Sequence, residues 1–185
     1  MTLLTGGGQK EVEVFPREGV VEWACVAMGA PRFAAGKVPV NLPLPEVVDY
    51  ETTVGGRVAR ITCLSMGNPH CIIFVPDVSQ VDVAVWGPLI ERDPMFPQRV
   101  NASFIQVEGK RTLRMRVWER GLGETPACGT GACAAAVAAV RLGYCPKDAD
   151  ITLHLPGGDL VVRVEEGQVW LTGDAQKDFE GILEV

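Results

Sequence analysis

The residue best suited to chemistry is a cysteine at the start of a predicted helix. Cys128 lies in "ETPACGTGACAAAVAAVRLG", after Pro126 and before Gly129 and Gly131. Glycines allow close approach of the backbone to a ligand, and the first N–H groups of a helix have no partner within it. Such a helix start favours both a bound carboxylate and a thiolate, so we expect a lowered pKa at Cys128. The alternative is a small residue that packs at a helix start.

A second candidate is a glutamate at the end of a predicted strand. In "LRMRVWER" one parity comprises Leu113, Met115, Val117 and Glu119. Alternate residues of a strand face opposite sides of a sheet. If the apolar set faces inward, Glu119 places a carboxylate at the inner rim, where a charge needs a partner or a task. The alternative is that the strand ends at Trp118 and Glu119 is solvated.

A third candidate lies in "SMGNPHC", a predicted turn that enters a buried strand. Asn68 precedes a proline and should therefore be extended. His70 lies at the strand entrance, a common place for a site residue, although a turn histidine with satisfied hydrogen bonds fits equally. Cys133 faces away from Cys128 on the helix and is predicted to pack in the core. His154 alternates with apolar residues, so we expect it to face solvent and give it no role.

These residues need a framework of strands around one helix. The helix is predicted from about Thr130 to Leu142, because it contains six alanines and is followed by Gly143. A short helix is predicted within 81–96, and "KVPVNLPLPE" reads as an extended connector. Alternating or continuous apolar runs predict strands near 11–15, 19–28, 57–64 and 71–76, a hairpin around Glu108-Gly109-Lys110, and three strands within 150–173. The predicted class is α+β.

The composition excludes several kinds of protein. The 185 residues carry a net charge of −6 without a basic run, so nucleic acid is not an expected partner. The longest mostly apolar run, from Ala132 to Val140, is too short to cross a bilayer, and residues 1–5 lack the basic and apolar regions of a signal peptide. We therefore expect a cytoplasmic protein without a membrane partner. Its six cysteines are expected to be reduced, and their spacing does not favour a zinc site.

Four segments together resemble diaminopimelate epimerase. They are "MGNPHC", "VNASFIQV", "VWERGLGETPACGTGACAAA" and "VWLTG". The match runs in order over nearly the whole chain, and its strongest element is the spacing from Glu119 to Cys128. The resemblance implies an α+β lobe in which a mixed or antiparallel sheet wraps around a central helix, with a partial second lobe.

The resemblance also implies a reaction and a set of site residues. That family interconverts L,L- and meso-diaminopimelate without pyridoxal phosphate, metal or any other cofactor, using two cysteines as acid and base. Cys128 matches one of the two, with His70 and Glu119 beside the reacting centre. The implied substrate-binding residues are Asn68, Asn101, Glu119, Arg120, Gly129 and Thr130.

The chain departs from the family pattern in one respect. The other catalytic cysteine of the family lies in a segment resembling Cys-Gly-Asn-Gly, which does not occur in these 185 residues. We therefore expect residues 1–29 and 174–185 to be a remnant of the N-terminal lobe, and residues 30–173 to be the complete C-terminal lobe. The expected protein partner is a separate N-terminal lobe or a second copy of the chain. With that lobe absent, Cys128 should be exposed and should alkylate fastest of the six cysteines.

Two other interpretations remain open. In one, the chain is an inactive or ligand-binding truncated half. In the other, it is another racemase or isomerase of the same superfold. The segment "MGNPHC" and the spacing from Glu119 and Arg120 to Cys128 argue against the last of these.

Overall fold

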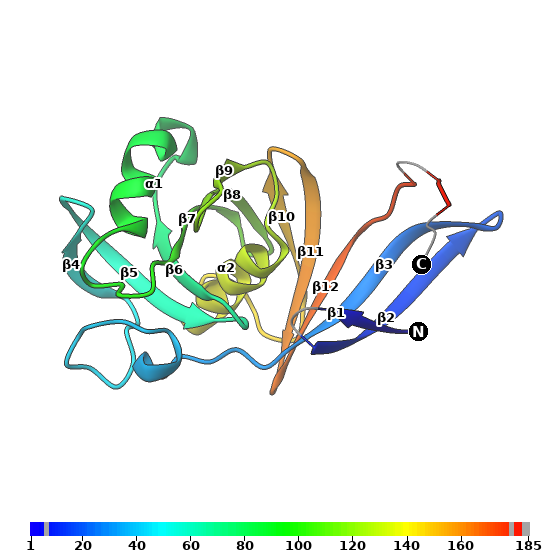
Figure 1. Ribbon diagram of the computed structural model, residues 1–185, viewed down its shortest axis with the longest axis horizontal. Helices are drawn as coiled ribbons and strands as arrows, with labels where there is room; N and C mark the ends of the chain where they lie inside the picture. The colour runs from blue at the N-terminus through cyan, green and yellow to red at the C-terminus, as the bar shows by residue number, and fades with distance from the viewer. Residues whose placement is uncertain (6–7, 178–179, 183–185) are drawn as a thin grey trace.

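The computed structural model covers residues 1–185 and describes all of them except 6–7, 178–179 and 183–185 (Figure 1). Two α-helices, α1 (Val83–Glu91) and α2 (Gly129–Arg141), and two 3₁₀ turns, η1 (Ala35–Lys37) and η2 (Val78–Gln80), occur in the described part. The strands there are β1 (Thr2–Thr5), β2 (Gly8–Arg17), β3 (Val20–Gly29), β4 (Tyr50–Val54), β5 (Arg57–Ser65), β6 (Pro69–Phe74), β7 (Asn101–Gly109), β8 (Thr112–Glu119), β9 (Gly123–Thr125), β10 (Asp150–Leu155), β11 (Gly158–Glu165) and β12 (Gln168–Asp174).

The described strands form one mixed sheet. Its order is β1-β2-β3-β12-β11-β10-β8-β7-β6-β5-β4, and β9 pairs with β8 outside this path. β6 pairs with β7 and β8 pairs with β10 in parallel, whereas the other pairs are antiparallel. The predicted α+β class with a mixed sheet is confirmed. The strands β1, β4 and β9 are short or polar and were not predicted from the sequence.

The two-residue period of the strands divides the core into two clusters on opposite faces of the sheet. Ile72 belongs to the cluster around α2, and its neighbour Ile73 belongs to the cluster beside α1. On β8 the parity predicted to face inward is buried against α2, with Leu113, Met115 and Val117 at most 1% exposed. Glu119 shares that parity, so the strand directs its side chain toward the α2 face.

Helix α2 is buried over most of its length because its side chains are small. Every residue from 131 to 139 is buried, and most of them are alanines. A helix surface of alanines allows close approach to strands, and α2 contacts β5, β6, β7, β8, β11 and β12. The helix ends one residue before the predicted limit. Gly143 follows with a φ of 78°, as expected for a residue after a helix end.

Helix α1 lies on the other face, within the segment where a short helix was predicted. The Asp82 carboxylate accepts a hydrogen bond from the Val85 N–H and caps its first turn. Trp86 packs against Phe104, with ring centroids 5.1 Å apart. The predicted connector at 37–46 begins at the end of η1 and contains no strand.

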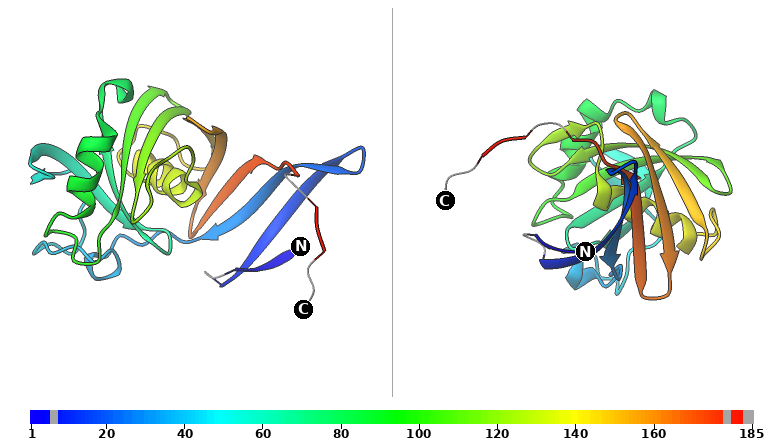
Figure 2. Two further views of the ribbon diagram at one scale, coloured as in Figure 1. Left: turned by 45° about the horizontal axis from the view of Figure 1, so that its top comes forward. Right: turned by 90° about the vertical axis from the view of Figure 1, so that its right-hand side faces the viewer.

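Residues 1–5 and 8–29, called the arm from here on, project from the rest of the described chain, called the body (Figures 1 and 2). The arm is joined to the body because β3 pairs with β12 from Asp174↔Trp23 to Val169↔Gly29. The structure therefore describes arm and body as parts of one continuous sheet.

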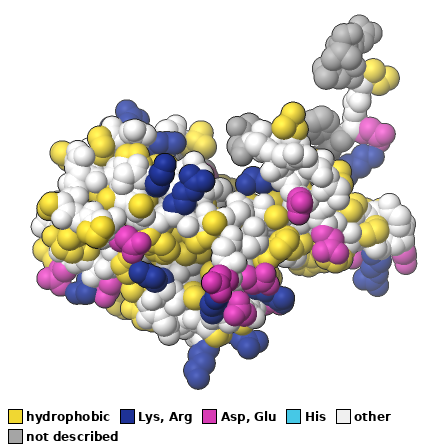
Figure 3. All heavy atoms as spheres, turned by 90° about the horizontal axis from the view of Figure 1, so that it is seen from below, with side chains coloured by type: hydrophobic (Ala, Val, Ile, Leu, Met, Phe, Trp, Pro, Cys, Tyr) yellow, Lys and Arg dark blue, Asp and Glu magenta, His cyan; other side chains and the backbone are white. Residues whose placement is uncertain are grey.

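The arm buries little of its own apolar surface. Val12 is the only buried hydrophobic residue among its described residues. Hydrophobic side chains reach the surface on both arm and body when the molecule is seen from below (Figure 3). Those of the arm that are more than 40% exposed include Leu3, Leu4, Phe15, Val20 and Trp23.

Candidate active site

Cys128 caps the N-terminus of α2. Its backbone is extended, with φ −144° and ψ 105°, and its Sγ accepts a hydrogen bond of 3.4 Å from the Gly131 N–H. The Thr130 hydroxyl lies 3.7 Å from the same sulfur. The glycine at 131 is required by space, because an added Cβ would lie 2.8 Å from Met115 Cε and 3.1 Å from the Cys128 sulfur. The first turn of α2 therefore packs closely against the Cys128 thiol.

The expected exposure and lowered pKa of Cys128 are both wrong for this structure. The residue is only 6% exposed, because it packs in the cluster around α2. Burial raises the pKa of its thiol to about 11, although the hydrogen bonds from Thr130 and Gly131 act in the opposite direction. The Glu119 carboxylate raises the thiol's pKa further. Desolvation outweighs the helix terminus here, so Cys128 is a thiol at neutral pH.

A chain of polar contacts links β6 to this helix start. The Asn68 amide Nδ2 donates to Thr130 Oγ1 at 3.2 Å, and Asn68 Oδ1 lies 3.0 Å from His70 Nε2. Because Asn68 uses its N–H₂ group toward Thr130, its oxygen faces the ring, and Nε2 of His70 must carry the proton. Side chains from two distant segments, Asn68 and Thr130, thereby meet at Cys128.

His70 is a fully buried neutral histidine. It is 0% exposed, and burial lowers its pKa to about 3, with a smaller contribution from the charge of Arg120. Its Nδ1 has no hydrogen-bond partner among the described residues. The ring therefore carries an unused acceptor beside the Asn68 contact.

Glu119 ends β8 and is half-buried. Thr125 Oγ1 donates to its Oε1 at 2.5 Å across the β8–β9 pair. The carboxylate thus has a partner, and it lies near enough to the Cys128 thiol to act on its pKa. Thr125 was not identified from the sequence, and the closely spaced Gly121 and Gly123 are the signal for the tight turn that brings it back.

Asn101 and Arg120 are placed by contacts with the backbone. The Asn101 amide donates to the Pro69 carbonyl at 2.9 Å, and its oxygen accepts from the Arg120 N–H at 2.9 Å. Asn101 is 3% exposed, so it joins the His70 strand to the Glu119 turn from within. The Arg120 guanidinium is exposed and donates to the Gln98 carbonyl at 3.0 Å. It therefore lies at the outer rim of the site.

The remaining predicted residues are also placed. Gly129 and Thr130 form the first turn of α2, and a Cβ added at Gly129 would lie 3.0 Å from Leu171. Cys133 is 0% exposed, and burial raises its pKa to about 12, so its predicted place in the core is confirmed. His154 is partly exposed, with Nδ1 2.7 Å from an Asp159 oxygen. The structure thus brings together His70, Asn68, Thr130, Cys128 and Glu119.

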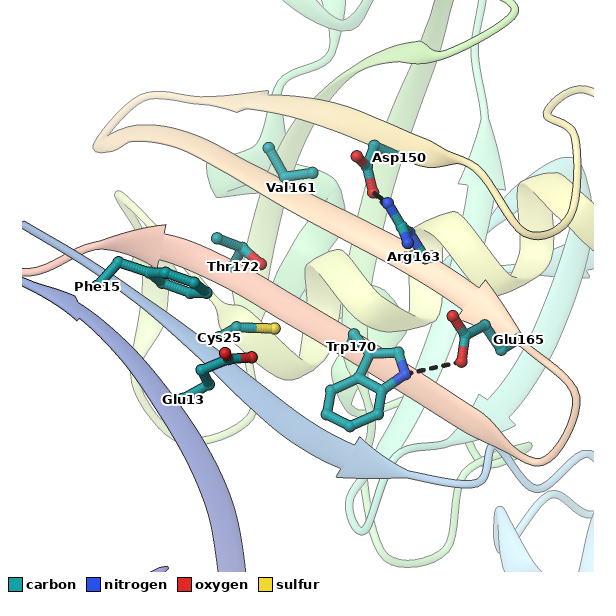
Figure 4. A pocket seen from close by; sticks show the side chains of 9 residues that line it. All are labelled: Glu13, Phe15, Cys25, Asp150, Val161, Arg163, Glu165, Trp170 and Thr172. Atoms are coloured by element: carbon teal, nitrogen blue, oxygen red, sulfur yellow. Dashed lines mark hydrogen bonds and ion pairs between the residues drawn. The ribbon is translucent and has the colours of Figure 1, made fainter. Parts of the chain in front are cut away.

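A hollow of about 490 Å³ lies elsewhere, where strands of the arm and body meet (Figure 4). Its lining residues are Glu13, Phe15, Cys25, Asp150, Val161, Arg163, Glu165, Trp170 and Thr172. None of these is a predicted site residue. The candidate site is therefore defined by its polar contacts and not by this hollow.

Two further features of the described chain are relevant to its chemistry. No group of three or more His, Cys, Asp or Glu side chains in that part is placed to hold a metal ion. The helices described there are all too short or too polar to cross a membrane.

Comparison with solved structures shows the fold. A hydroxyproline epimerase from Agrobacterium vitis matches with a TM-score of 0.68, over 94% of this chain and 55% of that protein. A predicted epimerase from Pseudomonas aeruginosa matches with a TM-score of 0.60, over 94% of this chain and 62% of that one. The sequence identities of 16% and 19% are too low for these matches to show more than a shared fold.

Comparison with curated sequences shows closer relatives. Diaminopimelate epimerase of Pelotomaculum thermopropionicum is 48% identical over 170 residues, which are 91% of this chain and 60% of the relative. Those of Thermosynechococcus vestitus and Bacillus licheniformis are 50% and 44% identical, over 85% and 96% of this chain and 58% and 62% of the relatives. The chain thus spans about 60% of the length of these relatives. The profile of the diaminopimelate epimerase family matches residues 62–177, more than half of the chain, and the chain therefore belongs to that family.

Proposed function

We propose that this chain is part of a cofactor-independent epimerase that interconverts L,L- and meso-diaminopimelate. The observation that carries the proposal is the thiol of Cys128, held at the start of α2 beside the Glu119 carboxylate. The substrate is inferred from relatives at 44 to 50% identity, which carry the name diaminopimelate epimerase. Chemistry on such a substrate needs a strong base, because the α-hydrogen of an amino acid is very weakly acidic and no cofactor delocalises the carbanion.

In this proposal Cys128 transfers the proton on one face of the α-carbon. As a thiol it donates a proton to the carbanion, and as a thiolate it removes the α-hydrogen in the reverse direction. The burial that raises its pKa to about 11 keeps it a thiol before reaction. The same burial strengthens the thiolate as a base, since a thiolate with a higher pKa binds its proton more tightly.

The start of α2 would hold the reacting carboxylate. The N–H groups of Gly129 and Thr130 belong to the first turn, where a helix offers donors and a favourable dipole to an anion. Donors at this position also stabilise negative charge as it develops on the carboxylate. His70, through Asn68 and Thr130, would keep this turn in place.

Two polar residues near the strand ends would complete substrate recognition. The exposed guanidinium of Arg120 suits a forked contact with the distal carboxylate, which would fix which end of the substrate reacts. Asn101 supports the backbone of Arg120 and would orient it.

Inversion also needs a proton donor on the opposite face of the α-carbon. We infer that a second cysteine, in a lobe outside these 185 residues, supplies it, because no Cys-Gly-Asn-Gly segment occurs in them. The arm with residues 174–185, of which 178–179 and 183–185 lie outside the described residues, would belong to that lobe, and residues 30–173 would form the C-terminal lobe with the sheet wrapped around α2. The exposed apolar residues of the arm, such as Phe15 and Trp23, support a covering partner there.

The test follows the L,L to meso conversion by the purified 185-residue chain. The expected result is no turnover by the chain alone and measurable turnover after addition of a separately expressed N-terminal lobe from a relative. Cys128→Ala is the control, and it should abolish the restored turnover while leaving the complex intact. Absence of turnover in an intact complex would overturn the proposed function. Turnover by the chain alone that is lost in Cys128→Ala would show that another group supplies the second acid.

A further inference from the structure

A buried carboxylate outside the predicted site grips the turn that carries Glu119. Glu91 is the last residue of α1, and its side chain is 3% exposed. Its Oε2 accepts from Trp118 Nε1 at 2.8 Å, and its Oε1 accepts from the Gly121 N–H at 3.0 Å. Arg99 Nη1 lies 3.3 Å from the same Oε1. One carboxylate therefore joins the end of β8, the following turn and the approach to β7.

The donors stand on both sides of two predicted site residues. Trp118 precedes Glu119, and Gly121 follows Arg120. Gly121 has a φ of 79°, a conformation that fixes a sharp turn and favours glycine. Glu91 thus holds the turn from the α1 face, whereas Glu119 follows the parity that faces α2.

The packing around Trp118 strengthens the same contact. A Cβ added at Gly87 would lie 2.5 Å from Trp118 Cβ and Cγ, so α1 and the tryptophan are in close contact. Trp118 therefore cannot move toward α1, and its indole N–H is held on Glu91.

A buried charge at this place requires an explanation. The turn does not by itself require a carboxylate, because Gly121 can adopt its conformation. Burying an ionised carboxylate also opposes folding unless its hydrogen bonds are satisfied. Burial by itself raises the pKa of Glu91, but the donors Trp118, Gly121 and Arg99 outweigh it, so the pKa lies below its ordinary value. The carboxylate is therefore ionised at neutral pH and holds all three donors.

We propose that Glu91 is a positioning residue that fixes the 118–121 turn so that the Glu119 carboxylate faces the Cys128 thiol. This inference rests on the proposed function for its purpose, because acid–base chemistry depends on placement within about an ångström. The proposed contact of Glu91 affects only the distance between the turn and the Cys128 thiol. It can therefore be tested without substrate.

The test measures the alkylation rate of Cys128 by iodoacetamide at pH 8, using peptide mass spectrometry of the folded chain. Glu119 raises the pKa of the thiol, so Glu119→Gln should increase the rate about threefold. Glu91→Ala should increase it by a similar factor, because the carboxylate moves away. In the Glu119→Gln background, Glu91→Ala should add nothing, since no carboxylate remains to be displaced.

A loosened structure gives a different pattern. If Glu91→Ala only opened access to the thiol, it would multiply the rate by the same factor in both backgrounds, and the proposal would be overturned. An unchanged rate in the native background would overturn it as well. Glu108→Gln is the matched control, because Glu108 pairs with Arg114 at the other end of β8 and should leave the rate unaltered.

A second variant covers the case in which Glu91→Ala does not fold. Glu91→Gln keeps one acceptor oxygen but opposes an N–H₂ group to the second donor, so it should give an intermediate rate. An unchanged rate in a folded Glu91→Gln variant would overturn the proposal. Because no substrate is present, coupled rates without epimerase activity would leave Glu91 in this role and refute only the proposed function. Activity without coupling would refute only the role of Glu91.

Discussion

The body and the arm use strands of similar length in different ways. In the body, residues 69–73 of β6 and 101–105 of β7 are buried on both faces of the sheet, one facing α2 and the other facing α1 and the connector. In the arm, β2 and β3 are ten residues long, yet Val12 is the only buried hydrophobic side chain described there. Regular strand geometry therefore does not by itself provide a core, since burial depends on what covers each face of the sheet.

The difference also explains where chemistry is located. The low pKa of His70 and the high pKa of Cys128 both arise from burial between the sheet and α2. The arm contributes no predicted site residue. Its link to the body is the β3–β12 pairing, in which Asp174 pairs with Trp23 near the outer end.

The largest expected effect is a difference in stability loss between two phenylalanine substitutions, one in the body and one in the arm. Phe104→Ala removes a side chain that is 0% exposed in the body and should lower the free energy of unfolding by about 3–5 kcal/mol. Phe15→Ala, at an arm residue that is 45% exposed, should lower it by less than about 1 kcal/mol. Urea unfolding followed by fluorescence measures both. Equal losses would mean that the arm is packed as firmly as the body.

The second prediction concerns acid stability, which should be controlled by the body. His70 has a pKa of about 3 when folded and an ordinary value of 6.5, so between these values the unfolded chain binds a proton that the folded chain excludes. The contribution of neutral His70 to the free energy of unfolding is therefore fully present above pH 6.5. It falls on acidification, by up to about 2 kcal/mol from pH 6.5 to 5. Urea unfolding at pH 7 and 5 measures this loss.

Two variants assign that loss to one residue. His70→Gln should remove most of the pH-dependent part, whereas His154→Gln, at a partly exposed histidine of β10, should retain it. A loss that persists unchanged in His70→Gln would assign the pH dependence to other groups.

The third prediction tests how closely α1 packs on the sheet. Gly87→Ala places a methyl group 2.5 Å from Trp118 and should destabilise the chain by about 1–3 kcal/mol. Gly36→Ala is a matched control in η1, where an added Cβ meets nothing within 4 Å, and should change stability by less than about 0.5 kcal/mol. A neutral Gly87→Ala in thermal unfolding would show that α1 can move away from Trp118.

Much of the body could be predicted because its signals are local. The alanine-rich segment and Gly143 locate α2 to within one residue, and the alternation along β8 identifies its buried face. The turn at Asn68 that leads into a buried strand was also predicted from neighbouring residues, and β6 begins at Pro69.

The predictions that were wrong or missing concern properties that depend on residues distant in the chain. The pKa of Cys128 reflects the sum of packing from several strands and the charge of Glu119, whereas the sequence around Cys128 shows only the helix start. Glu91 was missed because its donors, Trp118 and Gly121, are 27 and 30 residues away. No periodicity in the chain encodes such contacts.

The smallest expected effect tests whether arm and body open as separate units. Val12 is 7% exposed, and Val12→Ala should weaken the arm by about 1 kcal/mol. Amides of β2 and β3 should then exchange with deuterium about fivefold faster, because exchange there requires only local opening. Amides of β6 and of residues 101–105 in β7 should keep their rates, since these segments are covered on both faces and exchange through larger openings. Val20→Ala is the control, at an arm residue that is 62% exposed, and should leave both sets of rates unchanged. If Val12→Ala accelerated exchange in the body by the same factor, the arm and body would unfold as one cooperative unit through the β3–β12 pairing, and the contrast between the two regions would be one of surface coverage alone.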